Sequence, residues 1–100
     1  MKNIVLICAA GMSTSLLVNK MKDYCKSINY EANINAYSMS EVDRYAEDAD
    51  IVLLGPQVRF NLNKIQSKYP HKEVQVIDMV DYGMMNGEKV MKKVIETIGE

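Results

Sequence analysis

Near the N-terminus, a cysteine is followed by a short run of small and hydroxyl-bearing residues in the stretch ICAAGMSTSLLV. Gly11 lets the backbone turn tightly, so several N–H groups can point towards one centre. The run then enters an apolar pattern typical of a helix, and the N-terminus of a helix attracts anions. Hydroxyl donors and helix caps are supplied by Ser13, Thr14 and Ser15. The stretch therefore predicts an oxyanion-binding loop.

Cys8 directly precedes this loop. The positive potential of inward-pointing N–H groups favours the thiolate, which is the nucleophilic form of cysteine. We therefore expect Cys8 to accept a phosphoryl group or a similar oxyanion. The alternative is that Cys8 is a small buried residue that ends a strand, and that the hydroxyls only cap a helix. A nucleotide loop of the form G-x-x-x-x-G-K-[ST] is excluded, because its second glycine and its lysine are absent.

The elements that must position this loop are readable from hydrophobic periodicity. Short apolar or alternating runs predict four strands, at Asn3–Ile7, Ala32–Tyr37, Asp50–Gly55 and Glu73–Asp78. Apolar residues at helical spacing predict a helix at Ser15–Ile28 and a short helix that ends before Pro70. A short helix is also expected after a capping box formed by Ser40 and Asp43, and a last helix is expected to have Asn86 as its N-cap. Cys25 flanks the apolar stripe of the first helix, so we expect it in the core. The stretch DYGMMNG, residues 81–87, is predicted to be a turn.

Strands that alternate with helices through short connections predict an α/β domain, in which a parallel sheet carries helices on both faces. Ligands bind such sheets beyond the carboxyl ends of the strands. That edge is expected to collect the residues that end or follow the predicted strands: Cys8, Tyr37, Ser38, Gly55, Pro56, Gln57 and Asp78. The loop after Cys8 thus lies at the edge where function is expected.

Composition limits the function classes. One hundred residues with 48% apolar content predict a single domain over residues 1–100. A net charge of -1 argues against nucleic-acid binding, which needs a clustered basic surface. The longest apolar run, Ile51–Leu54, is far short of the roughly 20 residues that span a bilayer, and the N-terminus lacks a signal-peptide pattern, so we expect a cytoplasmic domain without membrane insertion. Two cysteines and the single His71 predict neither a metal site nor a cofactor.

A cysteine loop on a four-stranded parallel sheet also describes the low-molecular-weight tyrosine phosphatases, which carry C-x-x-x-x-x-R-S. Counting from Cys8, Thr14 occupies the arginine position, and no Asp-Pro acid motif follows. Because loss of a catalytic arginine typically costs ~10³-fold or more in rate, a phosphomonoester hydrolase is disfavoured. A loop of neutral donors suits a relay that must pass its phosphoryl group on. A phosphatase or arsenate-reductase-like enzyme, and a non-catalytic phosphate- or flavin-binding module, remain alternatives.

The stretches CAAGMSTSLLV, DIVLLGPQV and EVQVIDMVDYG resemble the enzyme IIB component of the bacterial sugar phosphotransferase system, in the lactose/cellobiose/chitobiose class and closest to the cellobiose type. This resemblance implies a three-layer sandwich with a parallel sheet of order 2-1-3-4, of the flavodoxin-like and low-molecular-weight tyrosine phosphatase-like kind. It also implies a cytoplasmic phosphotransferase. A cysteine takes a phosphoryl group from a phosphohistidine of the IIA component and hands it to a sugar in the IIC membrane permease.

By this resemblance Cys8 is the phosphorylated nucleophile, and a cradle of backbone N–H groups and hydroxyls is formed by Ala9, Ala10, Gly11, Met12, Ser13, Thr14 and Ser15. The family commonly has a serine where this chain has Ala9, which removes one side-chain donor and leaves the backbone donor. Contacts with partners are expected from Met12, Gln57 and Tyr82. For Gln57 the alternative is a turn cap, and for Tyr82 a cover of the core. Asp78 and Asp81 either orient amides or face solvent.

Overall fold

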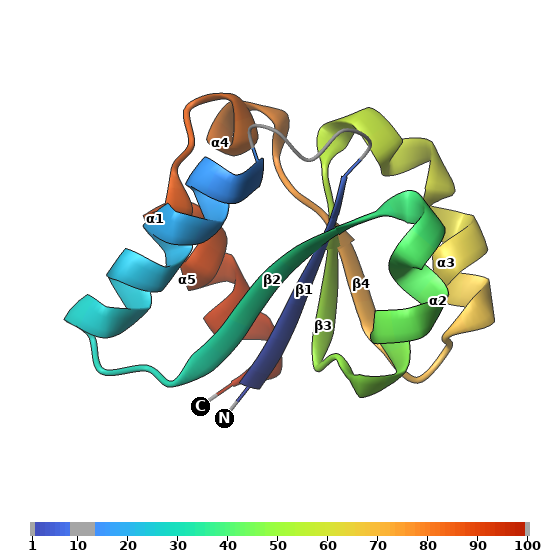
Figure 1. The fold of residues 1–100 in the computed structure, drawn as a ribbon, viewed down its shortest axis with the longest axis horizontal. Helices are drawn as coiled ribbons and strands as arrows, with labels where there is room; N and C mark the ends of the chain where they lie inside the picture. The colour runs from blue at the N-terminus through green and yellow to red at the C-terminus, as the bar shows by residue number, and fades with distance from the viewer. Residues whose placement is uncertain (1, 9–13, 100) are drawn as a thin grey trace.

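A computed structural model describes residues 2–8 and 14–99 of the chain (Figure 1). Its strands are β1 (Lys2–Cys8), β2 (Ala32–Ser38), β3 (Ile51–Leu54) and β4 (Glu73–Val76). Its α-helices are α1 (Thr14–Ser27), α2 (Val42–Tyr45), α3 (Leu62–Lys68), α4 (Met79–Gly83) and α5 (Gly87–Ile98). Three short 3₁₀ segments cover Met39–Glu41, Ala46–Asp48 and Pro56–Asn61. The predicted strands and the two long helices are confirmed to within a few residues at each end.

The four strands form one sheet of order β2-β1-β3-β4, and every neighbouring pair is parallel. This confirms the predicted order. In the register of the sheet, Cys8 lies beside Ser38, and Ile7 lies beside Leu54. Leu54 in turn lies beside Val76. The carboxyl ends of all four strands therefore meet at one edge, which we call the carboxyl edge.

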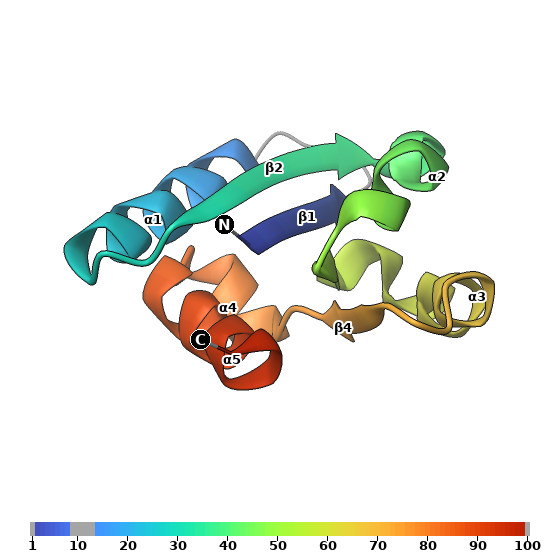
Figure 2. The same cartoon turned by 90° about the horizontal axis from the view of Figure 1, so that it is seen from below.

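The sheet is covered on both faces, which makes a three-layer sandwich (Figures 1 and 2). On one face Ile4 and Leu6 pack with residues of α1 and α5, including Leu17 and Met91. On the other face Val5 and Ile7 pack with α2 and α3. Cys25 is buried in the first of these two cores, as predicted, and burial raises the pKa of its thiol. Alternation of side chains along β1 thus supplies both cores from one strand.

Helix starts differ from the sequence prediction at two places. The capping box expected from Ser40 and Asp43 is wrong: Ser38 is the N-cap of the 3₁₀ segment, and its backbone N–H donates to Oε1 of Glu41 at 3.1 Å. The turn expected at residues 81–87 is wrong in part, because its first residues belong to helix α4. At α5 the prediction holds, since Oδ1 of Asn86 accepts a hydrogen bond from the N–H of Lys89.

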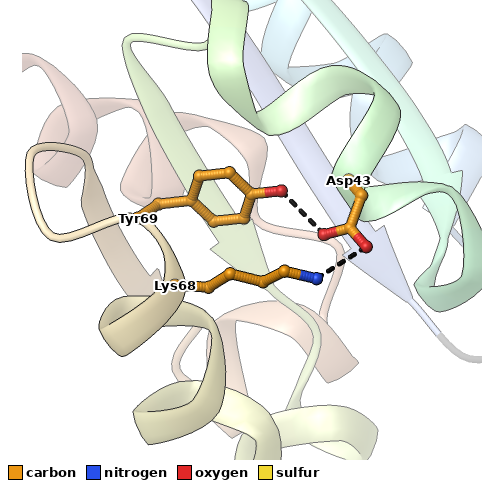
Figure 3. Close-up of polar contacts among 3 residues, drawn as sticks. All are labelled: Asp43, Lys68 and Tyr69. Carbon is orange, nitrogen blue, oxygen red and sulfur yellow. Dashed lines mark hydrogen bonds and ion pairs between the residues drawn. The ribbon is translucent and has the colours of Figure 1, made fainter.

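A polar cluster joins α2 to the end of α3 (Figure 3). One carboxylate oxygen of Asp43 accepts a hydrogen bond from the hydroxyl of Tyr69, and the other pairs with Nζ of Lys68, both at 2.7 Å. The Lys68 hydrogen bond, followed by that of Tyr69, holds the pKa of Asp43 below its usual value. The hydrogen bond to Asp43 raises the pKa of Tyr69 to about 12.

None of the helices in residues 2–8 and 14–99 combines the length and the apolar character needed to cross a membrane.

Candidate functional site

Cys8 is the last residue of the central strand β1 and lies at the carboxyl edge, as predicted. It pairs with Ser38 of β2 on one side, and on the other side the preceding residue, Ile7, pairs with Leu54 of β3. Its side chain is almost fully buried, at 1% exposure, and it forms no disulfide. The sheet therefore holds the backbone of this cysteine in place, and its side chain is enclosed by its neighbours.

The phosphate cradle predicted after Cys8 falls mainly outside the described residues, which applies to Ala9, Ala10, Gly11, Met12 and Ser13. The described chain resumes at Thr14, the first residue of α1, and Ser15 follows in the first turn with an exposed side chain. The start of α1 thus follows the carboxyl end of β1 after a short connection. This is the strand–loop–helix arrangement in which helix N–H groups can face an anion.

Tyr82 contacts the sulfur of Cys8. Its hydroxyl donates a hydrogen bond to Sγ at 3.8 Å, across 74 positions of sequence, and its side chain is buried. Tyr82 comes from α4, which Figure 1 shows near the start of α1. A hydroxyl in this position stabilises a sulfur that carries negative charge without adding a charge of its own.

Asp78 holds the helix that carries Tyr82. Its Oδ2 atom accepts hydrogen bonds from the N–H groups of Val80 and Asp81, at 3.0 and 3.2 Å, so it is the N-cap of α4. This answers the question that the sequence left open for Asp78, which orients amides of its own helix. Asp81 is buried beside this cap, at 7% exposure. Asp78 thus supports the thiol site through α4 and Tyr82.

Gln57 and its neighbours, which follow β3, also border the site around Cys8. Gln57 is exposed in the 3₁₀ segment that follows β3, and its carboxamide folds back towards Gly55. The guanidinium of Arg59 donates to the backbone oxygen of Pro56 at 2.9 Å, which ties this segment together. The structure therefore brings Cys8, Gln57 and Tyr82 to one edge, and the partner contacts expected from Met12, Gln57 and Tyr82 stay predictions.

Two contacts of the thiol were missed from the sequence, those of Tyr82 with Sγ and of Gly55 with the same sulfur. Gly55 precedes a proline, a pattern that is read as a strand end and carries no sign of a packing role. Tyr82 lies in a stretch predicted to be a turn. Its helix could have been found from Asp78, because an aspartate that precedes a short apolar segment is a helix N-cap signal.

Comparisons with known proteins agree with this geometry. The family described as "PTS system, Lactose/Cellobiose specific IIB subunit" matches residues 3–93 of the chain. The oligo-beta-mannoside-specific EIIB component of Bacillus subtilis (strain 168) is 43% identical over 97 residues, covering 95% of this chain and 94% of that protein. The galactose-specific EIIB component of Lactococcus lactis subsp. cremoris (strain MG1363) is 42% identical and covers 90% of each chain.

A solved structure shows the same likeness. The solution structure of the cellobiose-specific phosphotransferase IIB component from Borrelia burgdorferi superposes with a TM-score of 0.78 at 41% identity, covering 95% of this chain and 89% of that one. Fold, edge chemistry and sequence thus point the same way. The chain belongs to the lactose/cellobiose-specific IIB family of the sugar phosphotransferase system, whose members are phosphotransferases that carry a phosphoryl group in sugar transport.

Proposed function

We propose that Cys8 is the residue that carries the phosphoryl group. The observation that supports this most strongly is the contact between the Tyr82 hydroxyl and Sγ of Cys8, at the carboxyl edge of the sheet. The other cysteine, Cys25, lies on the buried face of α1 in the first core, with no such neighbour among its described contacts. A nucleophile needs a group that stabilises its anion, which Tyr82 supplies, and Cys8 lies at the carboxyl edge, where ligands of parallel sheets bind.

In the first step the thiolate of Cys8 attacks the phosphorus of a phosphohistidine on the IIA component. An S–P bond forms as the N–P bond breaks, and the electron pair of that bond returns to the imidazole. We assign the balancing of negative charge on the equatorial oxygens to the backbone N–H groups of residues 9–15 and to their hydroxyls. The Tyr82 hydroxyl stabilises the attacking thiolate before the bond forms.

In the second step a sugar hydroxyl in the IIC permease attacks the same phosphorus. An O–P bond forms as the S–P bond breaks, and the electron pair leaves with the sulfur as a thiolate. The proton of the sugar hydroxyl goes to a base outside this chain. Tyr82 assists here too, because its hydrogen bond strengthens as charge returns to Sγ. Since residues 9–15 contain no arginine, the phosphocysteine is held by neutral donors and is readily given up.

The partners follow from the family, whose EIIB components work with IIA and IIC components. We assign the contacts with them to the carboxyl edge, through Met12, Gln57 and Tyr82. The exposed carboxamide of Gln57 is suited to hydrogen bonds with a docked surface. The whole chain acts as one domain, residues 1–100, at the cytoplasmic face of the permease.

The sugar is proposed as cellobiose or a related β-linked disaccharide. This rests on relatives named for oligo-beta-mannoside and for cellobiose, although another relative is named for galactose. Relatives of nearly equal identity thus differ in sugar, which fits a carrier that leaves sugar recognition to the permease.

The test is phosphoryl uptake from a phosphorylated IIA component, followed by intact-mass measurement. Cys8→Ser is expected to lose all uptake, because an alcohol at this position is a poor nucleophile at neutral pH. Cys25→Ser is the matched control and should take up one phosphoryl group. Full uptake by Cys8→Ser would contradict the proposal. Steady release of inorganic phosphate without a sugar acceptor would identify the hydrolase alternative instead.

A further inference from the structure

Gly55 directly follows β3, and its backbone does not require a glycine. Its dihedral angles, φ -62° and ψ 152°, are extended values that any residue adopts. Its N–H donates a hydrogen bond to the backbone oxygen of Ile7 at 2.8 Å, which an alanine would do equally well. The absence of a side chain at this position must therefore have another cause.

That cause is the close approach of two side chains. A Cβ at Gly55 would lie 2.9 Å from Sγ of Cys8 and 2.7 Å from Oε1 of Gln57. Ordinary contacts between non-bonded carbons are about 3.5–4.0 Å, and sulfur is larger than carbon. The sulfur of Cys8 therefore lies so close to Gly55 that it takes up space that a methyl group would need.

The steric clashes of a Cβ at Gly55 with Gln57 and with Cys8 differ in how easily the neighbouring side chain can move away. Gln57 is exposed, and its carboxamide is the far end of a flexible side chain that can turn into solvent. Cys8 is 1% exposed, its strand is paired on both sides, and the Tyr82 hydroxyl lies 3.8 Å from its sulfur. A methyl group at Gly55 would thus push the sulfur aside by at least about 0.5 Å.

We propose that Gly55 is a positioning residue for phosphoryl transfer: its missing side chain places the Cys8 sulfur against Tyr82 and in line with the incoming phosphorus. This inference rests on the proposed role of Cys8. Displacement of a reacting atom by about 1 Å costs on the order of 100-fold in rate. Gly55 acts through the sulfur and does not itself touch the phosphoryl group.

The kinetic test compares Gly55→Ala with Gly83→Ala. Gly83 lies in α4, and a Cβ there would meet nothing within 4 Å, so it is a matched control. With phosphorylated IIA as donor, Gly55→Ala should lower the maximal rate of uptake by about 10- to 100-fold, with little change in the half-saturating donor concentration. Gly83→Ala should behave as the wild type. Equal rates for the two variants would overturn the proposal.

The variant Gln57→Ala distinguishes the effect of the steric clash with Gln57 from that of the clash with the Cys8 sulfur. If a displaced Gln57 were the cause, Gln57→Ala would reproduce the full rate loss of Gly55→Ala, and the assignment to the sulfur would be overturned. The expected result is that Gln57→Ala loses much less of the maximal rate. Any loss that it does show should appear in the half-saturating donor concentration, as expected of a partner contact.

A stability cycle tests the same contact without a phosphoryl donor. Gly55→Ala is expected to lower the thermal midpoint, and the loss should shrink to the level of Gly83→Ala in a Cys8→Ala background, where no sulfur is present. If Gly55→Ala does not fold, the double variant should fold; failure of both, or an unchanged loss, would overturn the proposal. If the wild type were not phosphorylated, the proposed function would be wrong. The stability cycle would still show whether the Cys8 sulfur contacts Gly55.

Discussion

Among residues 2–8 and 14–99, the contacts described for the sulfur of Cys8 come from groups that carry no formal charge. A tyrosine hydroxyl donates to it, a glycine leaves room for it, and the main chain on both sides holds its strand in place. A neutral donor stabilises a thiolate less than an arginine or lysine would. The site therefore suits a sulfur that attacks as a nucleophile in one step and departs as a leaving group in the next, since neither the thiolate nor the phosphorylated sulfur is strongly favoured.

Tyr82→Phe tests the contribution of the hydroxyl. The ring stays in its packing position, and the variant loses the hydrogen bond to sulfur, worth about 1 kcal/mol, or about fivefold in rate. We expect the alkylation of Cys8 by iodoacetamide at neutral pH to slow by about that factor. Tyr69→Phe is the control, because its hydroxyl bonds Asp43 in the other core's layer. Equal alkylation rates for Tyr82→Phe and wild type would show that the hydroxyl does not stabilise the thiolate.

At the scale of single residues, the sequence predicts Cys8 as the nucleophile but does not predict its surroundings. Cys8 is recognisable because its neighbours in the chain supply the chemistry. Tyr82 and Gly55 reach the sulfur only through the register of β3 beside β1 and the placement of α4. Such contacts depend on long-range geometry, which no local pattern encodes.

The elements show where local signals suffice. The strands were predicted from their apolar runs and α5 from its Asn86 cap, because burial and capping depend on residues close in sequence. The cap of the helical segment after β2 was predicted two residues too late, at Ser40 instead of Ser38. Strand β2 extends to Ser38, so the first helical turn begins there, and Glu41 supplies the carboxylate that Asp43 was expected to supply. Asp43 is instead engaged with α3.

The contacts of Asp43 with Lys68 and Tyr69 predict how the stability of the fold depends on pH in the acidic and in the alkaline range. The pKa of Asp43 is held below its usual value of 3.8 by Lys68 and Tyr69, so its stabilising effect is present above that value and lost as pH falls through the lowered pKa. The pKa of Tyr69 is raised to about 12 from a usual 10.0, so its effect is present below pH 10.0 and lost as pH rises towards 12.

Asp43→Asn should remove both effects. Urea unfolding across the pH range is expected to show the wild type more stable than the variant at neutral pH, with the difference vanishing in strong acid. Spectrophotometric titration of the tyrosines should show that the latest-ionising tyrosine of the wild type ionises earlier in the variant. A variant with an unchanged tyrosine titration would mean that the contact between Asp43 and Tyr69 does not persist in solution.

On the scale of the whole molecule, one sheet serves two cores. Alternate residues of β1 face opposite helix layers, so loss of either layer exposes apolar side chains of the same strand. The fold class and strand order were predictable because parallel strands with short helical connections admit few arrangements. The broken helical segments around α2 were not, since their ends are set by packing against the sheet.

This shared sheet predicts a single cooperative unfolding transition. Met91→Ala in α5 and Ile65→Ala in α3 each remove a buried side chain, at a cost of about 2–5 kcal/mol. Both variants should unfold at lower temperature, with circular dichroism and tyrosine fluorescence giving the same midpoint. Leu16→Ala, at a position 51% exposed on α1, is the control and should change stability little. Two separate transitions in either core variant would mean that the layers unfold independently.

The two ends of the described chain lie together at the edge of the sheet opposite Cys8 (Figure 1). Lys2 begins β1, and the backbone oxygen of Gly99 accepts a hydrogen bond from Tyr30, just before β2 starts. The seven residues of β1 separate these ends from the thiol, a length of about 20 Å. A linker, an affinity tag or a solid support attached at either end therefore lies at the end of the sheet remote from the Cys8 sulfur. Tethered in this way, the domain keeps its working edge open to whatever approaches it.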